Sequence, residues 1–236
     1  MSLLDVRDLE SGYGGQSVVR SVSIAVQPGE VVAVIGPNGA GKSTMLDTIV
    51  GLVKPQCGSV SMNGHDITGI DPEKTLENGI AYVPQTRNIF PSLTVQETLE
   101  VCFKRSDFAV AFDEILQLFP RLKQRLRSRA GLLSGGERQM LAIARALINR
   151  PFELIIMDEP SAALSVDNVR IIFERISWIR SQGIAVLLVE QNALKALEIS
   201  DRAYVMESGR VVAEDSATAL LESPTIAELF LGVRHS

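Results

Sequence analysis

The chain lacks the features that mark disulfide-built, metal-built and membrane-spanning proteins. It has only two cysteines, Cys57 and Cys102, and their separation fits neither a metal-ligand pattern nor a disulfide framework. No run of roughly eighteen apolar residues occurs, so no segment is predicted to cross a bilayer. The first ten residues carry four charges and no long apolar stretch, which is not typical of a secretory signal. A reducing compartment is therefore expected.

An excess of basic charge is also missing. The formal net charge is −5. This argues against nucleic acid as a partner, because protein surfaces that bind nucleic acid are normally basic. What the chain does have is ample apolar content, with 46% hydrophobic residues in 236. That length and composition predict one large domain, or a core domain with an insertion.

Apolar runs alternate with helical periodicity along most of the chain, which predicts a mainly parallel sheet covered on both faces. The expected strands are Leu3–Leu9, Val18–Val26, the β-branched run EVVAVIG, Ser59–Met62, Ile80–Val83, LIIMD, IAVLLVE and a hairpin that turns at Ser208–Gly209. The expected helices are Gly41 to about Val50, Val166–Ser181, Ala193–Ile199 and Ser216–Leu231.

Residues from about 92 to 129 have helical periodicity and no convincing strand. This change in pattern predicts that they form the main part of an inserted helical subdomain. Residues 1–91 and 130–236 would then make up the core of a single domain.

The segment GPNGAGKS, residues 36–43, has the GxxxxGK[ST] spacing of a phosphate-binding loop. Glycines let backbone N–H groups converge on phosphate oxygens, and the following helix adds its positive end. A chance glycine-rich turn is the alternative, but the position between a strand and a helix favours the loop. The predicted nucleotide-binding residues are Gly36, Pro37, Asn38, Gly39, Ala40, Gly41, Lys42, Ser43 and Thr44.

Two carboxylates follow the strand LIIMD, at the strand end where open α/β sheets bind ligands. Asp158 is predicted to serve a magnesium ion together with the Ser43 hydroxyl. Glu159 is predicted to orient the attacking water or accept its proton. Taken alone, such a pair could be a solvated loop; beside a phosphate loop it indicates ATP hydrolysis.

A second glycine pair occurs in LSGGE, residues 133–137, before the helix RQMLAIARALINR. Ser134, Gly135 and Gly136 would lie at a helix N-terminus, which is an anion site. A capped helix start with Ser134 as N-cap explains the same residues equally well. The helix should bury Leu141, Ala144, Leu147 and Ile148.

The phosphate loop, LSGGE and IIMDEP, in that order, resemble the ATP-binding cassette of ABC transporters over essentially the whole chain. The resemblance implies an α/β fold: a P-loop NTPase core with a mainly parallel sheet, an N-terminal antiparallel β portion and an inserted helical subdomain. It also implies that LSGGE, the signature segment, closes over ATP held by the phosphate loop of a second cassette, head to tail. Two ATP molecules would lie between two chains.

Other site residues come from the same resemblance. Tyr13 matches the aromatic residue that stacks on adenine, although an ordinary edge-strand tyrosine remains an alternative. Gln85 matches the glutamine that reaches magnesium and the γ-phosphate. In SAALSVD, residues 161–167, Ser165 replaces the usual aspartate of the D-loop.

The clearest departure is Gln191, which stands where the broad family carries its switch histidine; the two histidines, His65 and His235, lie elsewhere. Glutamine can donate a hydrogen bond to the γ-phosphate, but not as a cation, and charge-assisted bonds are roughly twice as strong. Lys42, Glu159 and Gln191 are the predicted catalytic residues, with Glu159 central to the chemistry.

VEQN, GYGG, HDITG and IFPSLTVQETL resemble the subgroup that takes up branched-chain and other hydrophobic amino acids. This implies two transmembrane permease subunits, a second cassette in a heterodimer or homodimer, and indirectly a periplasmic substrate-binding protein. It also implies a place on the cytoplasmic face of a bacterial inner membrane. A urea or short-amide importer of the same subgroup is the alternative.

Two further segments are predicted to have surface roles. QTRNIFPSL, residues 85–93, is predicted to line the groove for a permease helix, with Phe90 and Leu93 as anchors, unless both belong to the subdomain core. RLKQRLRSR, residues 121–129, is predicted to be a solvated helix docked by Leu122 and Leu126, with anionic lipid contact as the alternative.

Two other classes compete with the transporter cassette. A P-loop kinase or GTPase acting alone would have no use for LSGGE. A coiled-coil DNA-repair ATPase would need a long insertion between Lys42 and Asp158, and a ribosome-acting tandem protein would need a second cassette in the chain. The sequence contains neither.

Overall fold

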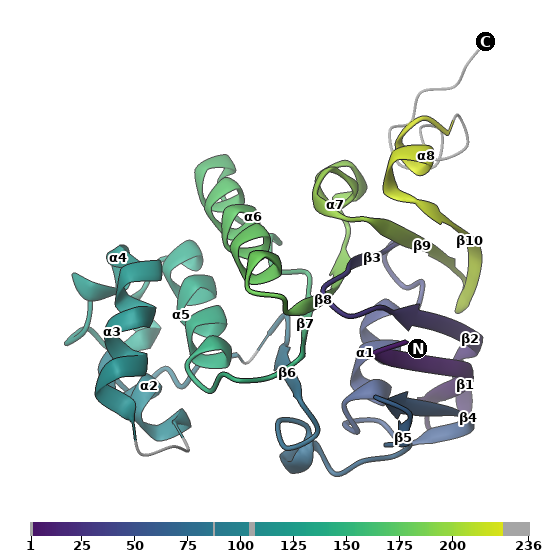
Figure 1. Cartoon of the computed structure of the whole chain (residues 1–236), viewed down its shortest axis with the longest axis horizontal. Helices are drawn as coiled ribbons and strands as arrows, with labels where there is room; N and C mark the ends of the chain where they lie inside the picture. The colour runs from purple at the N-terminus through teal and green to yellow at the C-terminus, as the bar shows by residue number, and fades with distance from the viewer. Residues whose placement is uncertain (1, 87, 104–106, 224–236) are drawn as a thin grey trace.

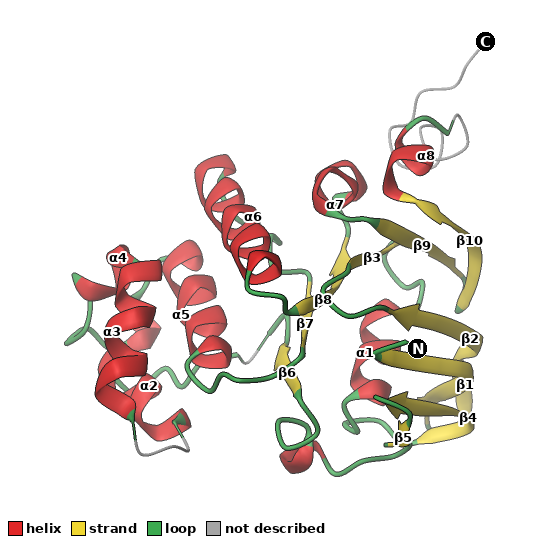
Figure 2. Ribbon diagram, in the orientation of Figure 1, coloured by secondary structure: helices red, strands yellow, loops and turns green. Residues whose placement is uncertain are grey.

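The structure is a computed structural model that describes residues 2–86, 88–103 and 107–223. A six-stranded sheet runs through its middle (Figures 1 and 2). In spatial order its strands are β10 (Arg210–Ser216), β9 (Arg202–Glu207), β3 (Val31–Ile35), β8 (Ala185–Glu190), β7 (Leu154–Asp158) and β6 (Ile80–Val83). All neighbours pair in parallel except β9 and β10.

Strands β3, β7 and β8 are buried at every residue, because helices cover one face of the sheet and a second sheet with α1 covers the other. This explains why these three strands have continuous apolar sequences rather than alternating ones.

The second sheet is four-stranded and antiparallel. Its order is β2 (Gln16–Val26), β1 (Leu4–Tyr13), β4 (Pro55–Met62) and β5 (His65–Asp66). Helix α1 (Lys42–Ile49) lies between this sheet and the large one, and it contacts β1, β2 and β7. The phosphate loop that precedes α1 is thereby held from both sides.

A helical arm lies on the side away from the four-stranded sheet (Figure 1). It consists of the helices of the predicted insertion, α2 (Val95–Cys102), α3 (Phe108–Leu118) and α4 (Pro120–Lys123), and of η2 (Ala130–Leu132) and α5 (Gly135–Leu147), which follow the insertion in the chain. Fully buried side chains pack them together: Leu99, Ile115, Phe119, Leu122 and Met140. The expected inner face of α5 is confirmed, since Leu141, Ala144, Leu147 and Ile148 are all buried.

The helix expected over residues 121–129 is wrong beyond Lys123, where α4 ends and turns follow. The carbonyls of Leu126 and Ser128 accept hydrogen bonds from the backbone N–H groups of Gln96 and Val95. Those N–H groups start α2 and have no partner within their own helix. Tertiary hydrogen bonding therefore replaces helix continuation. Leu122 is buried as expected, and Leu126 is partly buried.

The remaining elements are η1 (Pro72–Lys74), α6 (Val166–Ser181), α7 (Ala193–Ile199) and α8 (Ala217–Leu221). The hairpin of β9 and β10 turns at Ser208–Gly209, as predicted. Of the expected helix at 216–231, α8 covers the first part, and residues from 224 onward lie outside the described residues, as does His235. Within the described residues, no helix has the length and apolar character needed to cross a membrane. The predicted α/β class is confirmed.

Candidate nucleotide-binding and catalytic site

Three neighbouring buried strands deliver the site. Because β3, β8 and β7 are parallel, their carboxyl ends meet at one edge of the sheet. The phosphate loop follows β3, Asp158 and Glu159 come at the end of β7, and Gln191 follows β8. The sheet thus brings together groups that are more than a hundred residues apart in the chain.

The phosphate loop has the backbone shape that its glycines allow. Gly39 and Gly41 have φ of 80° and 97°, in the left-handed region that favours glycine. A Cβ on Gly36 would lie 2.2 Å from the carbonyl oxygen of Met206, so only glycine fits against β9 there. Gly41 caps α1, whose first N–H groups point into the loop's concavity.

Lys42 is buried inside this loop. Its side chain is 4% exposed, and its Nζ donates to the carbonyl oxygens of Gly36 at 2.8 Å and Pro37 at 3.1 Å. Glu159 Oε1 lies 3.9 Å from the same nitrogen. Burial lowers the pKa of Lys42, and nearby carboxylates, Glu159 first, oppose that shift. A desolvated cation at this position is suited to binding phosphate oxygens.

Asp158 is 4% exposed and accepts a hydrogen bond of 3.1 Å from the Ser43 hydroxyl. Burial raises its pKa to about 6, and the hydrogen bond from Ser43 opposes part of that shift. A buried carboxylate beside a hydroxyl fits Mg²⁺, which prefers oxygen ligands and takes few from the protein when phosphates supply the rest. In keeping with this, the described residues contain no group of three or more His, Cys, Asp or Glu that could hold a metal ion alone.

Glu159 is in a strained backbone conformation, with φ of 44° in the left-handed region that non-glycine residues rarely adopt. Its backbone N–H is fixed by the carbonyl oxygen of Val189 on β8 at 2.8 Å. Its Oε2 accepts a bond of 2.7 Å from Gln85 Nε2. The strain points the carboxylate out of the strand end, toward Lys42 and Gln85.

A cavity of about 490 Å³ is lined by Lys42 and Glu159 but not by Asp158. Of the predicted residues, Gln85, Glu159 and Gln191 line it together with the phosphate loop from Asn38 to Thr44. Tyr13 and the signature residues Ser134, Gly135 and Gly136 are not among its lining residues. Tyr13 is 56% exposed at the tip of the β1–β2 hairpin. One chain thus builds only part of the predicted site.

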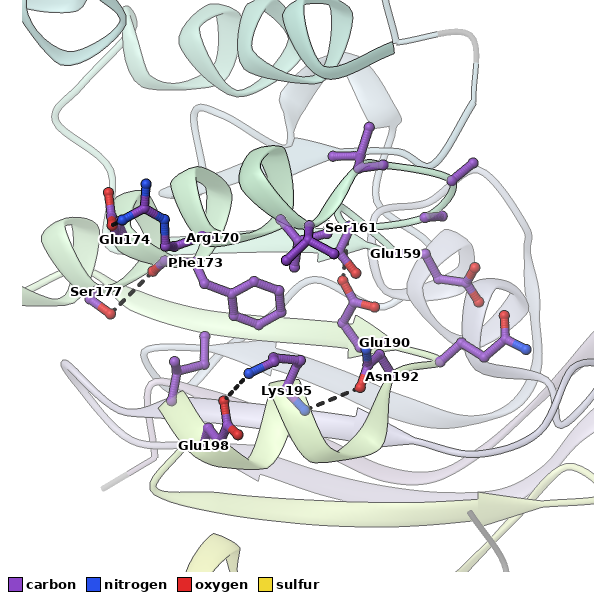
Figure 3. Close-up of a pocket in the computed structure, with 17 residues that line it drawn as sticks. Glu159, Ser161, Arg170, Phe173, Glu174, Ser177, Glu190, Asn192, Lys195 and Glu198 are labelled. Carbon is purple, nitrogen blue, oxygen red and sulfur yellow. Dashed lines mark hydrogen bonds and ion pairs between the residues drawn. The ribbon is translucent and has the colours of Figure 1, made fainter. Parts of the chain in front are cut away.

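Sequence reasoning missed Val18 and Ala162, which also line this cavity, and it missed Glu190. Glu190 is 1% exposed and accepts a bond of 2.9 Å from the backbone N–H of Ser161 in the D-loop. Burial raises its pKa, against the hydrogen bonds from Ser161. Figure 3 shows its carboxylate beside Ser161, in a larger cavity of about 750 Å³ between α6 and α7. Glu190 is the last residue of β8, after five apolar residues, and no motif in the sequence marks it.

The larger cavity contains Glu159, Glu190 and Gln191 but none of the phosphate loop. The smaller cavity is the one that the phosphate loop and Lys42 line. In the D-loop, Ser165 caps α6 without a side-chain hydrogen bond. His65, one of the two histidines, is exposed on β5, away from the site.

The signature segment begins α5 with a capping box. Ser134 Oγ accepts from the Glu137 N–H, and Glu137 Oε2 accepts from the Ser134 N–H at 2.9 Å. The capping interpretation of Ser134 is therefore confirmed. The box uses the N–H groups of Ser134 and Glu137 and not those of Gly135 and Gly136, of which Gly135 is exposed and Gly136 is buried.

This geometry is that of a P-loop nucleotide-binding protein, with a glycine-rich loop around a buried lysine and two carboxylates at one sheet edge. The ABC transporter family model matches residues 19–162, which is more than half of the chain. The chain belongs to the ABC transporter family, as an ATP-binding cassette whose ATPase activity is coupled to transport.

Relatives match nearly end to end. The high-affinity branched-chain amino acid transport ATP-binding protein BraG of Pseudomonas aeruginosa is 43% identical, covering 98% of this chain and 100% of that protein. A probable branched-chain amino acid transport ATP-binding protein, LivF of Archaeoglobus fulgidus, is 43% identical over 95% of this chain and 97% of its own. The lipopolysaccharide export ATP-binding protein LptB of Escherichia coli is 32% identical, covering 98% of both chains.

Solved structures agree with the fold. A nucleotide-free cassette from an ABC transporter superposes with a TM-score of 0.87 at 29% identity, covering 99% of this chain and 100% of that one. A dimeric post-hydrolysis cassette bound to ADP and Pi superposes with a TM-score of 0.80 at 26% identity, covering 91% and 98%. The family thus binds nucleotide.

Burial of Asp158 makes the free energy of unfolding depend on pH. Its folded-state pKa is raised from 3.8 to about 6, so ionisation disfavours the folded state. The contribution of the protonated carboxyl to the free energy of unfolding is fully present below about pH 4 and is lost as the pH rises through about 6. Without Mg²⁺ and ATP, Asp158→Asn should be more stable than the parent at pH 8, by at most about 3 kcal/mol.

Urea denaturation of both proteins from pH 4 to 8 measures this difference. The gap should close toward pH 4. An equal gap at every pH, or a less stable variant at pH 8, would contradict the assignment of a desolvated acid.

Proposed function

We propose that this chain is the ATP-binding and ATP-hydrolysing subunit of an ABC importer for branched-chain amino acids. The observation that carries the proposal is the cavity in which the phosphate loop, Gln85, Glu159 and Gln191 meet. The cargo rests on similarity to two relatives whose names specify branched-chain amino acid transport. No residue of the site bears on it.

The roles follow from the contacts. Lys42 and the loop N–H groups bind the β- and γ-phosphates, and Gln191 donates a hydrogen bond to the γ-phosphate. Ser43, Asp158 and Gln85 hold Mg²⁺, which supplies charge neutralisation on the phosphate oxygens. Glu159, held by Gln85 at 2.7 Å, orients the attacking water and accepts its proton. Proton acceptance by a positioned carboxylate contributes about 10²–10⁴ in rate.

The site is completed by a second cassette. Ser134, Gly135 and Gly136 do not line the cavity of their own chain, so we infer that they close over the nucleotide of the other cassette, and Tyr13 stacks on adenine. A dimeric cassette with ADP and Pi among the similar structures supports this arrangement. Either a homodimer or a heterodimer satisfies the geometry.

Closure of this dimer would pull on two transmembrane permease subunits fed by a periplasmic substrate-binding protein. The chain would then sit on the cytoplasmic face of a bacterial inner membrane, held by those permeases. We also propose the division in which about 92–129 is the main part of a helical subdomain and 1–91 with 130–236 is the nucleotide-binding core. Helices α2 and α4 pack on α5, which carries the signature.

Two substitutions separate binding from chemistry. Lys42→Ala should weaken binding of a fluorescent ATP analogue roughly tenfold or more, because it removes a buried cation from the phosphates. Glu159→Gln should keep binding within about twofold and lower phosphate release by at least ~10². Analogue titration and a phosphate-release assay measure the two effects, with the exposed Val101→Ala as a control. Parent-rate hydrolysis by Glu159→Gln would refute its assigned role.

The permease groove is a separate proposal. Phe90 is 46% exposed and Leu52 56% exposed, and both line a groove of about 570 Å³ with Tyr82, Cys102 and Ala146. Leu93 is half-buried and is not among the lining residues, so Leu52 replaces it as the second apolar anchor. The groove lies between the core and the helical arm, so a movement of one against the other would change the shape of the groove.

In a reconstituted transporter, Phe90→Ala and Leu52→Ala together should reduce permease stimulation of the ATPase about tenfold, because the docking surface loses its apolar anchors. Val101→Ala, an exposed apolar residue on α2 outside the groove, should not. Stimulation is the ratio of ATPase rates with and without permease. Unchanged stimulation in the double variant would remove this docking surface.

A further inference from the structure

The five basic residues of the segment 121–129 are all exposed, but two of them make side-chain hydrogen bonds to other parts of the chain. Arg121 and Arg125 are engaged by the part of the chain around the signature segment. The other three, Lys123, Arg127 and Arg129, are exposed as well. The hydrogen bonds of Arg121 and Arg125 point to a function of these two side chains at the signature.

Arg125 reaches the last residue of the signature. Its Nε lies 3.1 Å from Glu137 Oε1, and the other carboxylate oxygen accepts from the Ser134 N–H. Burial alone would raise the pKa of Glu137, but the hydrogen bonds of Ser134 and the charge of Arg125 keep it below the ordinary value. Because Arg125 is itself half exposed, its contribution is modest.

Arg121 acts on the signature through Asn168 of α6. Its Nη1 donates to Asn168 Oδ1 at 2.9 Å. The amide nitrogen of Asn168 lies so close to Gly136 that a Cβ built there would be 2.2 Å from it. The side chain of Asn168 is thus held between Arg121 and the second glycine of the signature.

These contacts join the helical arm to α6. Arg121 and Gly136 belong to the helical arm, whereas Asn168 belongs to α6, which begins immediately after the D-loop. Figure 1 shows α5 and α6 side by side, and the contact between Gly136 and Asn168 places their N-terminal ends together. The signature glycines and the D-loop are therefore fixed relative to each other within one chain.

We infer that Arg121 and Asn168 are positioning residues that hold the signature segment in register with the D-loop of its own chain, so that both meet the nucleotide of the other cassette together. The inference rests on the proposed head-to-tail function. It adds to that function a positioning role for two residues that contact no nucleotide. Loss of the contact frees Gly135 and Gly136 to move, and a cassette would then keep its own ATP affinity but close poorly over its partner's ATP.

The test is made in the Glu159→Gln background, with the full chain alone or with its companion subunits, and uses Mg²⁺ and ATP. Arg121→Ala and Asn168→Ala should each weaken ATP-driven association about tenfold by sedimentation, while binding of a fluorescent ATP analogue to the separate chain changes less than twofold. Lys123→Ala and Arg127→Ala are the matched controls from the same segment and should leave both values unchanged.

A double-mutant cycle separates a shared contact from general damage. Arg121→Ala combined with Asn168→Ala should weaken association no more than either single change, because both act through one bond. Asn168→Asp, which keeps an oxygen acceptor for Arg121, should retain association. Additive losses, or a melting temperature that falls in parallel with association, would overturn the inference.

The Glu159→Gln variant, which is the parent of the Arg121 and Asn168 variants, separates failure of the proposed function from failure of this inference. If Glu159→Gln alone shows no ATP-driven association, the proposed function fails and this inference falls with it. If the parent associates and Arg121→Ala associates equally well, only the inference is wrong.

Discussion

The burial of β3, β8 and β7 is the constraint on which the rest of the structure depends. These strands have no exposed residue, so their polar groups can appear only where the strands end. Because all three are parallel, their ends coincide, and the phosphate loop, Asp158, Glu159 and Gln191 are delivered to one edge. The desolvation that raises the pKa of Asp158 and lowers that of Lys42 follows from the same burial. Bound phosphate and magnesium would offset it.

The signature segment lies apart from the phosphate-loop cavity of its own chain. The phosphate loop is fixed between the two sheets by α1, whereas the signature begins α5 in the helical arm. The cavity of the loop lacks every signature residue. Within the proposed mechanism, a nucleotide bound to the loop leaves its γ-phosphate side open until another cassette covers it. The free energy of ATP binding then stabilises the association of the two chains. Hydrolysis removes that stabilisation, so the chains can separate and the transporter can return to its starting state.

Local patterns in the sequence predicted the elements whose formation depends on local chemistry. Strands β6 and β7 and helices α6 and α7 have the predicted bounds, because apolar period and chain breaks define them. The end of α4 at Lys123 could not be predicted, since the carbonyls beyond it serve α2 instead. Glu190 lies in a strand whose other residues are all apolar, and Val18 reaches the cavity only through the packing of β2 on the loop. Such contacts exist only after folding.

In the proposed mechanism ATP joins two half-sites that come from two cassettes, and disulfide trapping measures whether it does. Cys57 and Cys102 are first replaced by serine. One cysteine is then introduced at Leu132, which is 81% exposed beside the signature, and a second at Asn38 of the facing cassette. The facing cassette is a second copy of the chain or, in a heterodimer, its companion with the cysteine at the corresponding position. In the Glu159→Gln background with Mg²⁺ and ATP, the account predicts a cross-link between the two chains that is absent without nucleotide. A cross-link within one chain, or one that forms equally without ATP, would contradict it.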